Sequence, residues 1–112
     1  MYTIRQNKVS RLIQKELAEF FQKESRTNFK GRLISVTVVR MSKDLSVAKI
    51  YLSIFPSESG EETLKLIKQL SGLIRGALGH KVGKQLRVVP ELDFFLDDSL
   101  DYIDNIGKAL NN

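Results

Sequence analysis

The chain contains no cysteine and only one histidine, His80, among its 112 residues. Without cysteine there is no disulfide framework and no thiolate chemistry, and a zinc site of cysteine and histidine has no ligand set. A Ser–His–Asp triad lacks support, and no glycine-rich loop ending in Lys-Ser or Lys-Thr is present to hold a nucleotide. These absences predict a protein that is not an enzyme, that uses no cofactor and that takes no small-molecule substrate.

Long hydrophobic runs are also missing. No apolar segment approaches the length needed to span a membrane, and residues 1–7 are too polar for a signal peptide. A chain without cysteine fits a reducing compartment. We therefore expect a cytoplasmic protein without a membrane partner.

Acidic residues are scarce in the first 90 residues, and basic residues are scarce in the last 22. Residues 1–55 carry eleven Lys and Arg against four Asp and Glu, and residues 56–90 carry six against three. Residues 91–112 carry one against six. The length allows a single domain, 1–112, so one domain has a basic majority that attracts anions and an acidic end.

The acidic end contains five aspartates within twelve residues: Asp93, Asp97, Asp98, Asp101 and Asp104. Carboxylates can bind Mg²⁺ or Ca²⁺, but this spacing does not match an EF-hand loop. Capping and dipole complementarity at a helix start explain the run more simply. We predict no metal site here.

Glycine is concentrated in one place. Four of the seven glycines, Gly72, Gly76, Gly79 and Gly83, are spaced as one stripe along a helix. Glycine costs about 1 kcal/mol relative to alanine inside a helix, so another backbone or a ligand is expected to come close. The same segment carries Arg75, Lys81, Lys84 and Arg87, and no acid lies between Glu62 and Glu91. A basic helix with little side-chain cover indicates phosphate, and most simply nucleic acid.

Apolar periodicity predicts the elements around this stripe. A helix is expected over 6–23, with the basic stripe Lys8, Arg11 and Lys15 on its polar side. β-Branched and alternating residues predict strands over 33–40 and 46–55, paired as a hairpin. Tyr51, on the second of these strands, is the best candidate for stacking on a base.

The second half of the chain is predicted to continue with helices and one more strand. Ser59 and Glu62 match a capping box, and a helical stripe then runs to about Val82 with a bend at Ser71-Gly72. A third strand is expected on both sides of Pro90, at a sheet edge. A last helix is expected from Asp98 or Ser99 to Leu110. The fold class is then α+β, a three-stranded sheet with helices packed on one face.

Several strings in this order resemble the bacterial ribosome-binding factor A family. They are the segment that begins RMSKDL at Arg40, the string Gly72–Arg75, the string Leu78-Gly79, the segment LRVVPELDF from Leu86 to Phe94, and DDS from Asp97. The resemblance covers nearly the whole chain. It implies a type II KH-like domain that binds the immature small (30S) ribosomal subunit, assists processing of 16S ribosomal RNA near its 5′ end, matters most in the cold and performs no catalysis.

In that family a helix–kink–helix built on Ala-x-Gly replaces the usual KH loop. The motif falls on Leu70-Ser71-Gly72, with leucine where the family usually has alanine. The string Gly76-Ala77-Leu78-Gly79 also matches the Gly-x-x-Gly of KH loops. Which of the two is the functional bend stays open at the level of sequence.

We therefore predict a monomeric assembly factor whose RNA contacts come from the bent helix pair and the first helix. The predicted RNA-binding residues are Ser71, Gly72, Arg75, Gly76, Gly79, Lys81, Lys84, Arg87, Lys8, Arg11 and Lys15. The alternative is a protein-binding adaptor whose glycine stripe receives a partner helix. Steep salt dependence of RNA binding favours the first reading.

Overall fold

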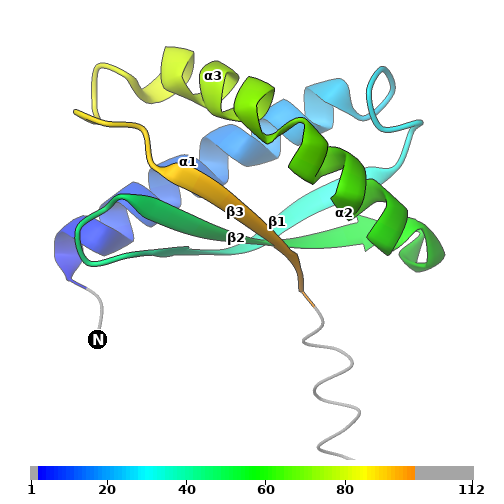
Figure 1. Ribbon diagram of the computed structural model, residues 1–112, viewed down its shortest axis with the longest axis horizontal. Helices are drawn as coiled ribbons and strands as arrows, with labels where there is room; N and C mark the ends of the chain where they lie inside the picture. The colour runs from blue at the N-terminus through cyan, green and yellow to red at the C-terminus, as the bar shows by residue number, and fades with distance from the viewer. Residues whose placement is uncertain (1–2, 98–112) are drawn as a thin grey trace, which may run out of the picture.

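The computed structural model describes residues 3–97, which form a layer of helices packed on a β-sheet (Figure 1). The elements follow in the order helix, two strands, two helices and a strand. They are α1 (Ile4–Glu24), β1 (Leu33–Met41), β2 (Val47–Phe55), the short 3-10 helix η1 (Ser57–Ser59), α2 (Gly60–Gln69), α3 (Ser71–Val82) and β3 (Glu91–Leu96). This order and the α+β class confirm the sequence prediction. The predicted last helix lies outside the described residues.

Helix α1 begins at a capping box that the sequence analysis did not find. The Thr3 hydroxyl accepts the Gln6 backbone N–H at 3.1 Å, and the Gln6 side chain accepts the Thr3 N–H at 2.8 Å. The buried stripe of α1 is Val9, Ile13, Leu17 and Phe21, as the periodicity predicted. By contrast, the predicted box at Ser59 is wrong: Ser59 makes no side-chain cap and its hydroxyl donates to the Pro56 carbonyl instead.

The sheet has the order β1-β2-β3. Strands β1 and β2 pair antiparallel with a bulge between Val36 and Val38, and β3 pairs parallel to β2 at the other edge. Parallel pairing follows because the chain crosses over one face of the sheet through α2 and α3 before it returns. The third strand is shorter than predicted. It begins only after Pro90, whose nitrogen has no hydrogen to donate, and residues 83–90 form a loop.

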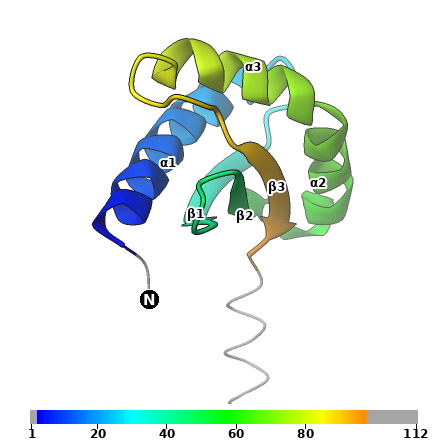
Figure 2. The same cartoon turned by 60° about the vertical axis from the view of Figure 1, so that its left-hand side comes forward.

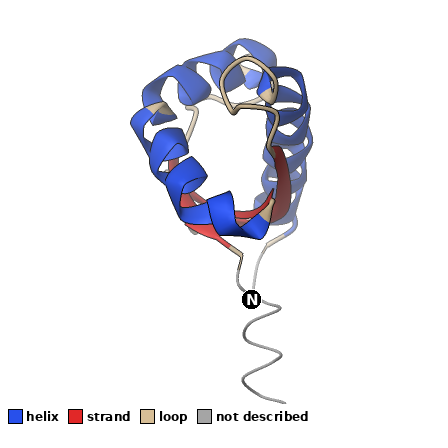
Figure 3. Ribbon diagram, turned by 90° about the vertical axis from the view of Figure 1, so that its right-hand side faces the viewer, coloured by secondary structure: helices blue, strands red, loops and turns tan. Residues whose placement is uncertain are grey.

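All three helices lie on the same face of the sheet. Figure 2 shows α1 and α2 on either side with α3 across the top, and Figure 3 shows the same layers from the end. The core between the layers centres on Phe21, which packs against Phe29 and Phe94 with ring centroids 5.7 and 6.4 Å away. Phe94 is 1% exposed, whereas its neighbour Phe95 lies on the opposite face of the strand.

Two glutamines of α1 reach the first strand. Gln6 Nε2 donates to the Met41 carbonyl at 3.2 Å, and Gln14 Nε2 donates to the carbonyls of Val36 and Thr37 at 3.1 and 3.4 Å. The second contact lies at the bulge, where the ladder with β2 is irregular. The side chain of Gln14 therefore serves carbonyls that the irregular ladder leaves short of partners.

The predicted bend between the two later helices is present at Leu70, one residue before the predicted pair. Leu70 has φ −94° and ψ 9°, and its N–H is shared between the Leu66 and Ile67 carbonyls at 3.1 Å each. Gly72 lies within the first turn of α3, and Gly76 and Gly79 lie in an unbroken helix. The bend is thus at Leu70-Ser71-Gly72 and not at the Gly-x-x-Gly string.

Candidate nucleic-acid interface

The outer side of α3 has almost no side-chain cover. The exposed residues of α3 are Gly72, Leu73, Arg75, Gly76, His80 and Lys81, and we call the part formed by Gly72, Leu73, Gly76 and His80 the bare face. A Cβ atom built on Gly72 or Gly76 would meet nothing within 4 Å, and Leu73 is 61% exposed. The backbone of α3 is therefore open to close approach from outside along about one and a half turns.

The other two glycines of the predicted stripe lie near the end of α3, Gly79 half-buried and Gly83 exposed. A Cβ on Gly79 would touch Val89 Cγ2 at 3.5 Å, and one on Gly83 would lie 2.7 Å from the Gly79 carbonyl oxygen. Both positions face the loop 83–90 or the last turn of the helix. The predicted stripe therefore has two parts: an added Cβ has free space at Gly72 and Gly76, but meets the loop 83–90 or the last turn of α3 at Gly79 and Gly83.

Arg75 has a structural role that its exposure does not reveal. Its Nε donates to the Pro90 carbonyl at 3.1 Å and one terminal nitrogen donates to the Val89 carbonyl at 2.6 Å. The guanidinium therefore fastens the end of the loop 83–90 to α3, just before β3 begins. A direct RNA contact by Arg75 stays a prediction, with only the remaining N–H groups available for it.

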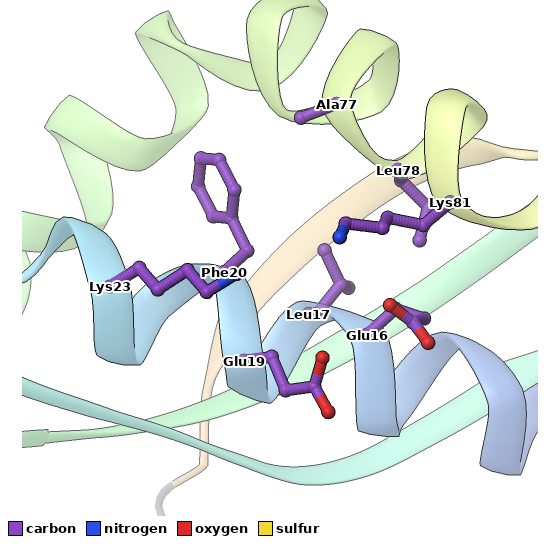
Figure 4. Close-up of a pocket in the computed structure, with 8 residues that line it drawn as sticks. All are labelled: Glu16, Leu17, Glu19, Phe20, Lys23, Ala77, Leu78 and Lys81. Atoms are coloured by element: carbon purple, nitrogen blue, oxygen red, sulfur yellow. The ribbon is translucent and has the colours of Figure 1, made fainter.

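The predicted lysines and Arg87 occupy separate places. Lys81 lines a groove of about 70 Å³ between α1 and α3, with an apolar floor that includes Phe20 and Leu78 and with Glu16 and Glu19 on the α1 side (Figure 4). Lys84 is exposed on the loop 83–90. Arg87 lies on the same loop and lines a hollow of about 210 Å³ together with Arg5 of α1.

The basic stripe of α1 is fully available. Lys8, Arg11 and Lys15 are exposed and lie on the side of the helix away from its buried residues. Within residues 3–97 the ion pairs are Lys30–Glu62 and Arg32–Glu62, so none of the three is neutralised there. The sequence prediction missed Arg5, which extends the stripe toward Arg87. Its position three residues before Lys8 was the available signal.

The turn between β1 and β2 is fixed by one carboxylate. Asp44 accepts hydrogen bonds from the Ser46 and Ser42 hydroxyls at 2.7 and 2.8 Å and from the Ser46 backbone at 3.1 Å. These bonds stabilise the charged form and lower the pKa of Asp44 from 3.8 to about 2. The turn therefore presents a permanent negative charge next to the basic hollow of Arg5 and Arg87.

Comparison with known proteins gives a consistent result. The family model described as ribosome-binding factor A matches residues 5–110. Ribosome-binding factor A of Cytophaga hutchinsonii is 50% identical over 99% of this chain and 84% of that protein, and the protein of the same name from Flavobacterium johnsoniae is 51% identical over 98% and 85%.

Solved structures agree. The crystal structure of ribosome-binding factor A from Thermus thermophilus superposes with a TM-score of 0.68 at 27% identity, over 85% of this chain and 97% of that one. A model of the Thermus thermophilus protein fitted into the electron cryomicroscopy map of a complex with the 30S subunit gives a TM-score of 0.61 at 31% identity, over 78% and 89%. Within the described part of this chain, no helix is long and apolar enough to cross a membrane.

Proposed function

Because this chain belongs to the ribosome-binding factor A family, we propose that it binds the immature small ribosomal subunit and assists the maturation of its 16S RNA without catalysis. The observation that carries the proposal is the bare face of α3 together with a basic stripe on α1 that forms no ion pair within residues 3–97. A relative of the same fold stands in a complex with the 30S subunit, which supports the same partner for this chain.

The bare face suits RNA backbone for a steric reason. With no Cβ at Gly72 and Gly76, a sugar-phosphate chain can approach the helix more closely than side chains would allow. The basic stripe then supplies charge to phosphates without reading sequence. Lys84 and Arg87 on the loop 83–90 add charge beyond the end of α3, where Arg87 lines a hollow together with Arg5 of α1.

In the proposed mode of action the protein works by occupying its binding site on the precursor subunit. The protein holds a conformation of the precursor RNA as a cytoplasmic monomer and is released when the subunit is complete. Rearrangement of RNA helices slows on cooling, so the requirement for such a factor is greatest in the cold. No group among the proposed RNA contacts is arranged to break a bond: the single histidine, His80, is exposed on the bare face with no nucleophile paired to it in the described residues.

The second candidate function is a protein-binding adaptor. Leu73 is 61% exposed on the bare face, and the groove between α1 and α3 has an apolar floor that could receive a side chain of a partner helix. Such a partner would bury apolar area and would bind with little dependence on salt. RNA binding has a log–log salt slope of several units when about four to six phosphates are neutralised.

The test is sedimentation of the tagged full chain with ribosomal particles from growing cells. The proposal requires the protein to travel with free small subunits and to be absent from translating ribosomes. A triple variant of the basic stripe with glutamates at positions 8, 11 and 15 should lose this association, and its release should be reproduced in the wild type by raising the salt. Association with no ribosomal particle would refute the proposal.

A further inference from the structure

The face of the sheet opposite the helices is open in the described part of the chain. Three neighbouring side chains, one from each strand, form a slanted row on it. Phe95 of β3 and Tyr51 of β2 are paired directly, and Arg40 of β1 is diagonal to Tyr51, since its partner on β2 is Lys49. The Tyr51 and Phe95 rings stack with centroids 5.3 Å apart and planes 26° apart. The Arg40 Cζ lies 5.8 Å from the Tyr51 centroid, within cation–π range.

A hollow of about 250 Å³ adjoins this row at the hairpin end of the sheet. Arg40, Lys49 and Tyr51 line it, and no acidic residue is part of its wall. The volume is just below the range of pockets that hold drug-sized molecules, about 300–1,000 Å³, and suits one planar base or one sugar-phosphate unit. Sheet stability would be enough to explain an aromatic cross-strand pair alone. It does not explain why a hollow lined by two cations lies next to the pair.

The charges around the hollow favour an anion. Within residues 3–97 neither Arg40 nor Lys49 forms an ion pair, because both ion pairs there use Glu62. The acids on or next to this face are Asp93, directly across from Lys49, Glu91 at the end of β3, and Asp44 in the turn. Asp44 is already held by two serine hydroxyls, so the carboxylates that compete for Lys49 are Asp93, directly across from it, and Glu91, one diagonal further.

We propose that this open sheet face is a second RNA site, which binds an unpaired nucleotide of a single-stranded segment. The base stacks on the face of Tyr51 turned away from Phe95, and the Arg40 guanidinium moves off that face to hold the adjoining phosphate together with Lys49. Unpaired bases are recognised by stacking on aromatic rings and on guanidinium planes, which are the groups this row presents. That the ligand is RNA rests on the function proposed above.

Two consequences follow from the position of this site. The helices and the open face lie on opposite sides of one sheet (Figure 1), so the protein contacts two RNA segments that are separated by its own thickness. The helix side holds phosphates, whereas the sheet side requires a base that is out of a duplex. The protein thereby favours states of the precursor in which a strand near it is still unpaired.

The first experiment uses an eight-nucleotide oligouridylate, which does not pair with itself, and the full chain. Fluorescence anisotropy should show binding that falls about tenfold or more in Tyr51→Val, which removes the stacking surface but keeps a strand-forming residue. Arg40→Ala with Lys49→Ala should weaken binding and reduce the log–log salt slope by about 1.4. Asp93→Asn is the matched control and should bind more tightly than the wild type, because one of the competing carboxylates is gone.

A second measurement needs no variant. Titration of the isotope-labelled wild type with the oligouridylate should shift amide signals of Lys49, Tyr51 and Phe95, in addition to any shifts at the phosphate-binding side of α1 and α3. Shifts confined to α1 and α3, or unchanged affinity in the Arg40/Lys49 double variant, would overturn the proposal.

The two proposals fail separately. Sedimentation with small subunits in the absence of oligouridylate binding removes the sheet site and leaves the proposed function intact. A photoreactive phenylalanine analogue at position 51 then identifies the occupant in the subunit complex: crosslinks to 16S RNA support the inference, and crosslinks only to a ribosomal protein refute it. Absence of subunit binding by a protein that still binds oligouridylate would refute the proposed function alone.

Discussion

Replacing Gly72 and Gly76 with alanine should stabilise the protein while weakening its binding to the small subunit. Both glycines lie in helical α3, neither has positive φ, and an added Cβ meets nothing within 4 Å. Each substitution then contributes about 0.4–1 kcal/mol to the free energy of unfolding, chiefly by restricting the unfolded chain. For a domain of this size the pair should raise the melting temperature by roughly 3–10 °C.

Binding should change in the opposite direction. If RNA backbone contacts the bare face, two methyl groups force it outward, and overpacking of a close contact costs about 1–3 kcal/mol, or fivefold to more than a hundredfold in affinity. Gly72→Leu adds more bulk and should lose more. Ser57→Leu is the control, since it places an equally bulky side chain at the exposed first residue of the 3-10 helix η1, and it should bind as the wild type does.

The assay is thermal denaturation of each variant, followed by titration of purified small subunits with labelled protein. A double alanine variant that is more stable and binds with unchanged affinity would refute the idea that the bare face is in contact with RNA. Lower stability of the double variant would refute the account of these glycines as strain-free helical positions.

Three further predictions concern Arg75, the basic stripe and Asp44. Arg75→Ala should lower the free energy of unfolding by about 1 kcal/mol or somewhat more, because the carbonyls of Val89 and Pro90 lose a charged donor, and a melting temperature equal to that of the wild type would contradict this role. Glutamates at the three positions of the basic stripe should abolish subunit binding at low salt with little change in melting, whereas wild-type affinity would place the RNA elsewhere. The Asp44 carboxyl should titrate near pH 2 by NMR and nearer 3.8 in Ser46→Ala; because its pKa is lowered on folding, its contribution to stability is complete above about pH 4 and is lost as the pH falls toward 2.

Elements with strong periodicity could be predicted from the sequence, and those that depend on distant partners could not. The stripe of α1 and the alternation in β2 report burial directly, so their positions agree with the structure within one or two residues. Parallel pairing of β3 has no local signal, since it depends on where the crossover returns. The Ser59-x-x-Glu62 string failed as a capping box because Ser59 ends a 3-10 turn with φ −91° and ψ 1°, not with the extended backbone of a capping residue, and its hydroxyl points back to the Pro56 carbonyl.

The site shows the same limit. That glycines and cations gather in residues 72–87 is a property of the sequence, but which glycines are open depends on the loop 83–90, which folds back over Gly79. In the sequence Arg75 looks like Lys84, a basic residue in a basic segment, yet in the structure its guanidinium donates hydrogen bonds to two carbonyls. The stacking of Tyr51 on Phe95 could be predicted only with knowledge of the register between β2 and β3.

The glutamines of α1 bear on how the protein avoids its own aggregation. A strand with free carbonyls can be extended by a strand of another molecule, and β1 is an edge strand with a bulge in it. Gln6 and Gln14 already occupy the carbonyls of Met41, Val36 and Thr37 from the same molecule. An incoming strand that sought these carbonyls would first have to displace two side-chain amides, one of them on a glutamine only 4% exposed. The helix whose outer side carries the basic stripe thus also protects the edge strand β1 from pairing with another chain.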